Sequence, residues 1–144
     1  MKEIMVAIDG CKHSARIVDT AVGLAKSLSA KIVLVYIAPK IAVPDDYVRN
    51  AKLDEPNTVD FYEEFWERVL GDLDERVEKQ KVPVETLFGV GNPSEFILER
   101  AKERGTSMIV VGVHGLHSLG KLRALGSTSR RIIENSPIPV IAVP

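Results

Sequence analysis

Five short runs rich in β-branched residues, separated by helical stretches, constrain the fold of this chain more than any other feature. The runs are Ile4–Ile8, Lys31–Ile37, Val84–Phe88, Met108–Gly112 and Pro139–Val143. Most are continuously apolar rather than alternating, which is typical of strands covered on both faces. Strands that alternate with helices predict right-handed βαβ units. We therefore expect an α/β fold, a three-layer α/β/α sandwich around a five-stranded parallel sheet of Rossmann-like type.

The first two helical stretches carry apolar residues at steps of three and four, the spacing of a helix with one buried face. Ser14 is a candidate cap for the first helix. The apolar positions are Ala15, Val18, Val22, Ala25 and Leu28 in the first stretch, and Tyr62, Trp66, Val69, Leu73 and Val77 between Thr58 and Lys79. Both helices should pack on the sheet through these positions.

The third and fourth helices have clear boundary signals. Asn92, Pro93 and Glu95 supply a capping side chain, a φ-locked first residue and a glutamate at the third helical position that should bond back to the capping residue. Gly105 should end that helix. The fourth helix should run from near Ser127 to about Asn135, before a proline-containing turn.

Length and composition fit one domain spanning residues 1–144. The 144 residues, 45% of them hydrophobic, suffice for one core. The segment from Pro39 to Asn57, with three prolines and four acidic residues, is predicted to be a variable loop insertion. A loop of this length serves as a lid, a partner-binding loop or a mobile insertion.

The charge balance and the N-terminal segment narrow the cellular setting. Lys and Arg total 19 against 20 Asp and Glu, and a net charge of −1 gives no reason to expect nucleic acid or an anionic membrane as partner. The single cysteine, Cys11, excludes an internal disulfide and is compatible with a reducing compartment. No leader-like segment and no run of the roughly 18 apolar residues needed to span a bilayer is present. We expect a soluble, cytoplasmic protein.

The segment after the fourth run holds the strongest candidate site, because open α/β sheets bind ligands at the carboxyl ends of their strands. Glycines there permit close backbone approach, and the helix start at Gly126-Ser127 presents free N–H groups. The loop residues concerned are Gly112, Gly115, Gly120 and Gly126, with His114, His117, Lys121 and Arg123 as donors or charges. Such a loop suits a polyphosphate, with His114 as a phosphate contact. A glycine-rich crossover that only turns the chain explains the loop physics equally well.

The sequence matches known catalytic and metal-binding motifs only in part. The P-loop spacing from Gly115 to Lys121 is followed by Leu122, where a hydroxyl must hold Mg²⁺. Cys11 and His13 lack an evident orienting group, and the histidine pair at 114 and 117 lacks further zinc ligands. We therefore expect neither catalytic residues nor a metal site in the protein itself.

Four segments spread over nearly the whole chain resemble the universal stress protein family. They are Ile4 to Gly10, the turn Gly91-Asn92-Pro93, the glycine loop from Gly112 to Ser127, and Pro137-Ile138-Pro139-Val140. The family pattern in the loop is Gly-x2-Gly-x9-Gly-Ser/Thr. Here ten residues, Leu116 to Leu125, separate the second and third glycines, one more than in the family.

The resemblance implies an adenine nucleotide alpha hydrolase-like fold that binds ATP or AMP, with Mg²⁺ accompanying the phosphates of ATP. It implies that Gly112, Gly115, Gly126 and Ser127 contact phosphate and ribose. It also implies that Asp9 and the backbone at Ile37 meet the adenine end. From its position alone, the Asp9 carboxylate serves equally to cap the following turn.

The resemblance also implies a homodimer, and the short apolar strand Pro139–Val143 is a candidate edge for it. The predicted function is a regulatory nucleotide-binding module of the stress response, not an enzyme. Two alternatives stay open: a nucleotide-free interaction protein that uses residues 39–57, and a slow nucleotide hydrolase. The extra loop residue favours the former, and Gly126-Ser127 at a helix start favours nucleotide binding.

Overall fold

The computed structural model describes residues 1–9, 13–38, 58–113 and 125–144. In chain order the elements are β1 (Lys2–Ile8), α1 (Ser14–Leu28), β2 (Ala30–Ala38), α3 (Thr58–Glu78), β3 (Val84–Val90), α4 (Pro93–Arg104), β4 (Met108–Gly112), α5 (Ser127–Asn135) and β5 (Val140–Val143). Each strand and helix predicted from the sequence is present, within two residues of its expected bounds. The predicted loop at 39–57 lies outside the described residues. None of the helices described is long and apolar enough to cross a membrane.

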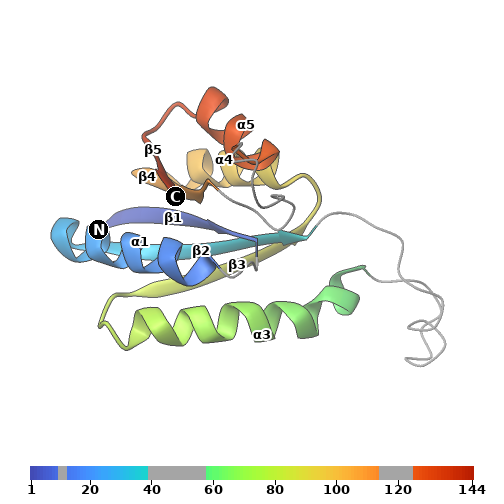
Figure 1. Cartoon of the computed structure of the whole chain (residues 1–144), viewed down its shortest axis with the longest axis horizontal. Helices are drawn as coiled ribbons and strands as arrows, with labels where there is room; N and C mark the ends of the chain where they lie inside the picture. The colour runs from blue at the N-terminus through green and yellow to red at the C-terminus, as the bar shows by residue number, and fades with distance from the viewer. Residues whose placement is uncertain (10–12, 39–57, 114–124) are drawn as a thin grey trace.

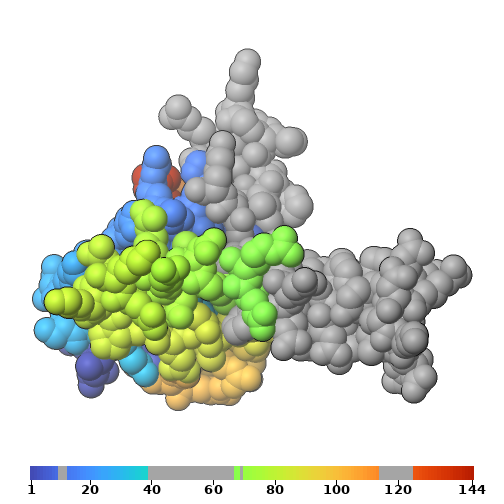
Figure 2. All heavy atoms as spheres, turned by 90° about the horizontal axis from the view of Figure 1, so that it is seen from below, coloured from blue at the N-terminus to red at the C-terminus, as the bar shows by residue number. Residues whose placement is uncertain are grey.

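The five strands form one sheet in the order β3-β2-β1-β4-β5, and every neighbouring pair is parallel. Helices α1 and α3 cover one face, and α4 and α5 cover the other (Figure 1). Seen from below, the side chains of α1 and α3 cover their face of the sheet (Figure 2). The predicted three-layer parallel α/β fold is therefore confirmed. Parallel strands are joined through helices, and these helices cover both faces of the sheet.

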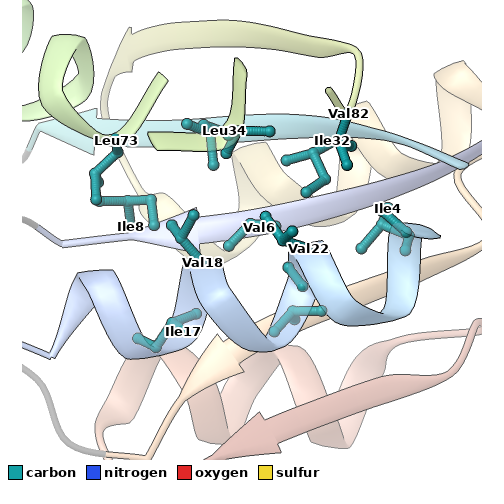
Figure 3. Packing of buried hydrophobic residues seen from close by; sticks show 14 of the residues in the cluster. Ile4, Val6, Ile8, Ile17, Val18, Val22, Ile32, Leu34, Leu73 and Val82 are labelled. Atoms are coloured by element: carbon teal, nitrogen blue, oxygen red, sulfur yellow. The ribbon is translucent and has the colours of Figure 1, made fainter. Parts of the chain in front are cut away.

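Alternate residues of the central strands fill two separate cores. Ile4, Val6 and Ile8 of β1 face α1, where Val18 and Val22 pack against them (Figure 3). The intervening residues face the opposite layer, where Ile97 and Ala101 of α4 and Ile132 of α5 lie. On that face the sheet contributes Met5, Val33, Val35, Ile37, Ile109 and Val111. The uninterrupted apolar runs in the sequence thus reflect burial on both sides of the sheet.

At α4 the predicted Asn92 cap, the first-position Pro93 and the Gly105 end are confirmed. The Oδ1 atom of Asn92 accepts hydrogen bonds from the Glu95 N–H at 3.2 Å and from the Ser94 hydroxyl at 2.9 Å. Gly105 ends the helix in the left-handed conformation, with φ at +67°. This geometry leaves α4 a fixed start directly after β3.

The prediction that Ser14 caps α1 is wrong. The capping position is His13, no side chain caps the helix, and Ser14 is the first helical residue. Ser14 is buried, and its Oγ has no hydrogen-bond partner in the structure. Because Ser14 lies one turn before Ile17 and Val18 on the inward face, its hydroxyl points toward the core and not back to the first N–H groups.

A cluster of charged side chains closes the amino-terminal edge of the sheet around the buried Glu3. Arg104 of α4 binds both carboxylate oxygens of Glu3 at 3.0 Å and both of Glu85 at 3.2 and 2.6 Å. Lys31 lies 3.2 Å from Glu3, and the Thr106 hydroxyl donates to it at 2.8 Å. Burial raises the pKa of Glu3, but the hydrogen bonds from Arg104, Thr106 and Lys31 outweigh it and hold this pKa below its ordinary value of 4.5.

Replacing Glu3 by Gln should lower the free energy of unfolding at pH 7 by about 1 to 3 kcal/mol, since it removes charge-assisted hydrogen bonds to a buried carboxylate. With its pKa lowered in the folded state, Glu3 stabilises the fold above pH 4.5, where the unfolded carboxyl is ionised. This stabilisation disappears as the pH falls through the folded pKa. Urea unfolding across pH 3 to 7 would therefore show a shallower acid limb for Glu3→Gln.

The matched control is Glu103→Gln, which breaks the exposed pair between Arg100 and Glu103 at 2.8 Å. We expect a change below about 0.5 kcal/mol and an unaltered acid limb, because exposed pairs contribute little. Equal effects of the two substitutions would show that the Glu3 cluster does not stabilise the fold.

Candidate ligand-binding site at the strand reversal

The chain order of the strands reverses between β1 and β4, and three of the predicted site residues meet at this point. The β1–β2 register pairs Ile8 with Tyr36, which places the next residue, Asp9, beside Ile37. The β1–β4 register pairs Val6 with Val110, which places Ile8 beside Gly112. Asp9, Ile37 and Gly112 therefore share the carboxyl edge of the sheet, where open α/β sheets bind ligands.

The two residues at the β1–β2 side present different groups. Asp9 is half-exposed and directly follows the last residue of β1. Ile37 is only 6% exposed, and its side chain belongs to the core under α4. Ile37 can therefore offer a ligand its main-chain groups but little of its side chain.

The start of α5 is anchored directly to the end of β4. The Ser129 hydroxyl donates to the Gly112 carbonyl oxygen at 2.7 Å, and the Gly126 N–H donates to the Val113 carbonyl oxygen at 3.4 Å. Gly126 is the capping residue, and no side-chain capping bond to the start of α5 is found among the residues that the structure describes. The first N–H groups of a helix have no partner within the helix, and its dipole favours an anion there. This arrangement can bind a phosphate through main-chain amides.

The site is also tied to the edge strand β5. The Val113 N–H donates to the Val143 carbonyl oxygen at 2.9 Å, and Nη1 of Arg16 donates to the Pro144 carbonyl oxygen at 3.2 Å. Val113 thus bonds to Gly126 through its carbonyl group and to β5 through its N–H. The end of β5 holds in place both the loop start after β4 and the first turn of α1.

The structure brings together Asp9, Ile37, Gly112, Gly126 and Ser127 of the residues predicted for nucleotide binding. His114 and Gly115 lie outside the described residues, as do Cys11 and the loop residues His117, Gly120, Lys121 and Arg123. Sequence analysis did not single out Ser129, although a hydroxyl residue in the first turn of a helix is a signal for a bond to nearby backbone.

Two open hollows lie against α1 and α3, and one of them extends to His13 and Arg16 at the start of α1. A bidentate ion pair between Asp19 and Arg76, at 2.6 and 2.7 Å, contributes to the lining of both. The hydrogen bonds from Arg76 hold the pKa of Asp19 below its ordinary value. Other lining residues, such as Lys26 and Glu75, are also charged. Cofactor sites are mostly apolar with a few convergent polar groups, so the carboxyl edge of the sheet is the better candidate.

No cluster of three or more His, Cys, Asp or Glu side chains that could hold a metal ion occurs in residues 1–9, 13–38, 58–113 and 125–144. Any cation at the edge would therefore need ligands from a bound phosphate or from the rest of the chain. Phosphate oxygens are usual Mg²⁺ ligands in nucleotide sites.

The parallel sheet, its two helical layers and the uncapped helix start at the strand reversal define a doubly wound α/β protein with a candidate anion site at its switch point. The sequence model of the universal stress protein family matches residues 1–144. The chain belongs to this family.

Relatives match along almost their full length. Universal stress protein YxiE of Bacillus subtilis is 33% identical over 147 residues, which cover 98% of this chain and 97% of the relative. A universal stress protein of Thermus aquaticus, named for its position 3′ of a QAH/OAS sulfhydrylase region, is 32% identical over 151 residues. That match covers 99% of this chain and 98% of the relative.

Solved structures share the fold. UspA from Lactobacillus plantarum superposes with a TM-score of 0.81 at 19% identity, covering 99% of this chain and 97% of its own. A universal stress protein from Archaeoglobus fulgidus in complex with dAMP gives 0.70 at 21% identity, covering 100% and 98%. A universal stress protein in complex with cAMP gives 0.68 at 24% identity, covering 99% and 95%.

Substituting Ser129 by Ala should lower the free energy of unfolding by about 1 kcal/mol, because the Gly112 carbonyl loses a short hydrogen bond in a half-buried position. Chemical denaturation measures the change. Ser27→Ala is the control, since the Ser27 hydroxyl donates to Gly23 on the exposed surface of α1 at 3.1 Å. If both variants unfold like the wild type, the hydroxyl of Ser129 does not anchor α5.

Proposed function

We propose that this protein binds an adenine nucleotide, ATP or AMP, at the strand reversal and acts as a regulatory module of the stress response. The observation that carries the proposal is the uncapped start of α5, bonded to the end of β4 and lying at the same edge as Asp9. A helix start suited to an anion, at the same edge of the sheet as a half-exposed aspartate, matches the two ends of a nucleotide, its phosphates and its base or ribose.

The phosphates would lie at the start of α5. In the proposed complex the main chain at Gly112 and Gly126 and the Ser127 hydroxyl contact phosphate and ribose. His114 and Gly115 complete this half of the site from the segment outside the described residues. Ser127 is exposed, which suits a hydroxyl that donates to a ligand.

The base would lie on the other side of β1. There the Asp9 carboxylate and the main chain at Ile37 meet the adenine end. The relatives in complex with dAMP and cAMP support an adenine ligand, because both ligands carry that base on a phosphorylated sugar. If ATP is the ligand, Mg²⁺ would accompany its phosphates.

Binding without rapid turnover is the proposed activity, exerted by one domain of residues 1–144 in the cytoplasm. A helix start stabilises bound phosphate but supplies no base to activate an attacking water. A regulatory protein of this kind would act through the change that occupancy makes at its surface. Steady release of phosphate from ATP would favour the slow hydrolase instead.

Gly126→Val tests the site because the folded chain does not itself require glycine there. The φ of Gly126 is −60°, and apart from its chain neighbours no heavy atom of the described residues stands within 4 Å of an added Cβ. The variant should keep its stability within about 1 kcal/mol, the usual range of cap substitutions. A bulky side chain at the phosphate position should weaken ATP and AMP binding at least about tenfold, the equivalent of 1.4 kcal/mol. Isothermal titration calorimetry measures both affinities.

Gly23→Ala is the control, because an added Cβ on that exposed residue of α1 also meets no atom within 4 Å. It should stabilise the helix by roughly 0.5 to 1 kcal/mol and leave nucleotide affinity unchanged. Equal affinity of the wild type and Gly126→Val would place the phosphates elsewhere. No binding by the wild type at millimolar nucleotide would overturn the proposed function.

A homodimer through β5 is part of the proposal. β5 pairs with β4 along one side and is the last strand of the sheet. Around it Val140 and Ile141 are half-buried, Pro139 and Ala142 are exposed, and Ile133 of α5 is 41% exposed. Free edge strands with apolar side chains favour pairing with a second chain.

Replacing Ala142 by Glu should convert a dimer to a monomer, since the two-fold pairing of β5 would bring an added charge into the contact between subunits. Ala142 is already exposed, so the monomer should retain its thermal stability. Light scattering should give twice the chain mass of 15.9 kDa for the wild type and that mass once for the variant. A wild type that is monomeric at micromolar concentration would contradict the proposal.

A further inference from the structure

Beneath the adenine end of the proposed site, three residues from different elements meet in one contact. Ile37 of β2 lies opposite Gly89 of β3 in the parallel register. A Cβ placed on Gly89 would stand 2.9 Å from Cε2 and 3.1 Å from Cζ of Phe96, and 3.1 Å from Cδ1 of Ile37. The ring of Phe96 and the side chain of Ile37 therefore both reach the space over Gly89, in the core under α4.

Gly89 is required for space and not for its backbone conformation. Among the described residues the glycines with positive φ are Gly91 and Gly105, and Gly89 is not one of them. Any side chain at position 89 would have to displace Phe96 or Ile37, because a contact of 2.9 Å is too short for a Cβ. The contact between the ring and Ile37 thus depends on the missing side chain of Gly89.

The Phe96 ring has a partner within α4, and the turn before α4 is bonded to the end of β2. The Arg100 guanidinium lies 5.0 Å from the ring centroid, within the range of a cation–π interaction. The Gly91 N–H donates to the Ala38 carbonyl oxygen at 2.9 Å, which joins the turn before α4 to the residue after Ile37. The start of the helix that carries Phe96 is thus joined to the last residue of β2.

We propose that Phe96 is a positioning residue for the nucleobase. This inference rests on the proposed function, in which the main chain at Ile37 meets the adenine. Because the Ile37 side chain is only 6% exposed, it acts as an anchor that sets the position of its own main chain beside Asp9. Phe96 holds that anchor. The phosphates bind beyond β1 at the start of α5, so loss of the ring should weaken binding of the base and spare binding of the phosphates.

The test compares ATP with inorganic triphosphate, which can occupy only the phosphate half of the site. Phe96→Ala should weaken ATP binding about fivefold to tenfold, which corresponds to one lost net hydrogen bond. Its affinity for triphosphate should stay within about twofold of the wild-type value. A twofold change corresponds to less than half the free energy of one such hydrogen bond. Phe96→Leu, which keeps an apolar side chain, and Gly89→Ala, which displaces the ring, should show the same selective loss in a milder form. Calorimetry gives both constants.

Leu98→Ala is the matched control, because Leu98 is another half-buried side chain of α4 that packs against the same core. It should lower the melting temperature but leave the ratio of ATP to triphosphate affinity unchanged. A merely structural role of Phe96 would make the two alanine variants alike in this ratio.

Hydrogen exchange tests the contact without nucleotide. Local loosening should speed amide exchange at residues 36–38 by about fivefold or more in Phe96→Ala relative to Leu98→Ala. Equal exchange in these variants, or equal losses of ATP and triphosphate affinity, would overturn the positioning role and leave the proposed function standing. A wild type that binds triphosphate but not ATP would overturn the adenine site itself, and the positioning role with it.

Discussion

Main-chain pairing of β1 with β2 on one side and with β4 on the other is the constraint on which the rest of the structure depends. Ile4, Met5 and Val6 are 0% exposed, and each contributes roughly 1.5 to 3 kcal/mol by burial. Because β1 must be covered on both faces, the helix after β2 packs on one face of the sheet and the helix after β4 packs on the other. This placement of the helices produces the strand reversal between β1 and β4. Main-chain groups at the carboxyl edge of these strands are then available to a ligand.

The two edges of the sheet use opposite kinds of chemistry. At the amino edge, Glu3 and Arg104 satisfy each other with side-chain charges, and the cluster joins α4 to the sheet. At the carboxyl edge, the start of α5 is held by Ser129 and Gly126, and its capping residue is a glycine, which has no side chain to cap it. A network whose charged groups pair with one another stabilises the fold without binding a ligand. A helix start whose capping residue is a glycine retains main-chain N–H donors for one. The stabilising cluster and the proposed binding site thus lie at opposite ends of the same strands.

Apolar periodicity was sufficient to predict the strands and helices, because burial on both faces leaves a continuous run and burial on one face leaves steps of three and four. The Asn92 cap was predictable since its hydrogen bond is local. The role of Ser14 was mispredicted because two requirements oppose each other at this residue. A capping side chain turns back to the first N–H groups of the helix, whereas a side chain on the inward face points toward the core. The contact of Phe96 with Ile37 could not be predicted, since it depends on the register that places Gly89 opposite Ile37 across two strands.

Glycines at the carboxyl edge are explained by different physical causes, and the difference bears on function. Gly91 has φ at +143°, a conformation that L side chains rarely adopt, and Gly89 leaves room for a ring. Among the described residues Gly126 shows neither reason, since its φ is −60° and an added Cβ would meet none of their atoms within 4 Å beyond its chain neighbours. Ser, Asp or Asn would cap α5 at least as well. The fold therefore does not explain why a glycine stands at this helix start, which is suited to anions. Close approach of a phosphate to the backbone would explain it.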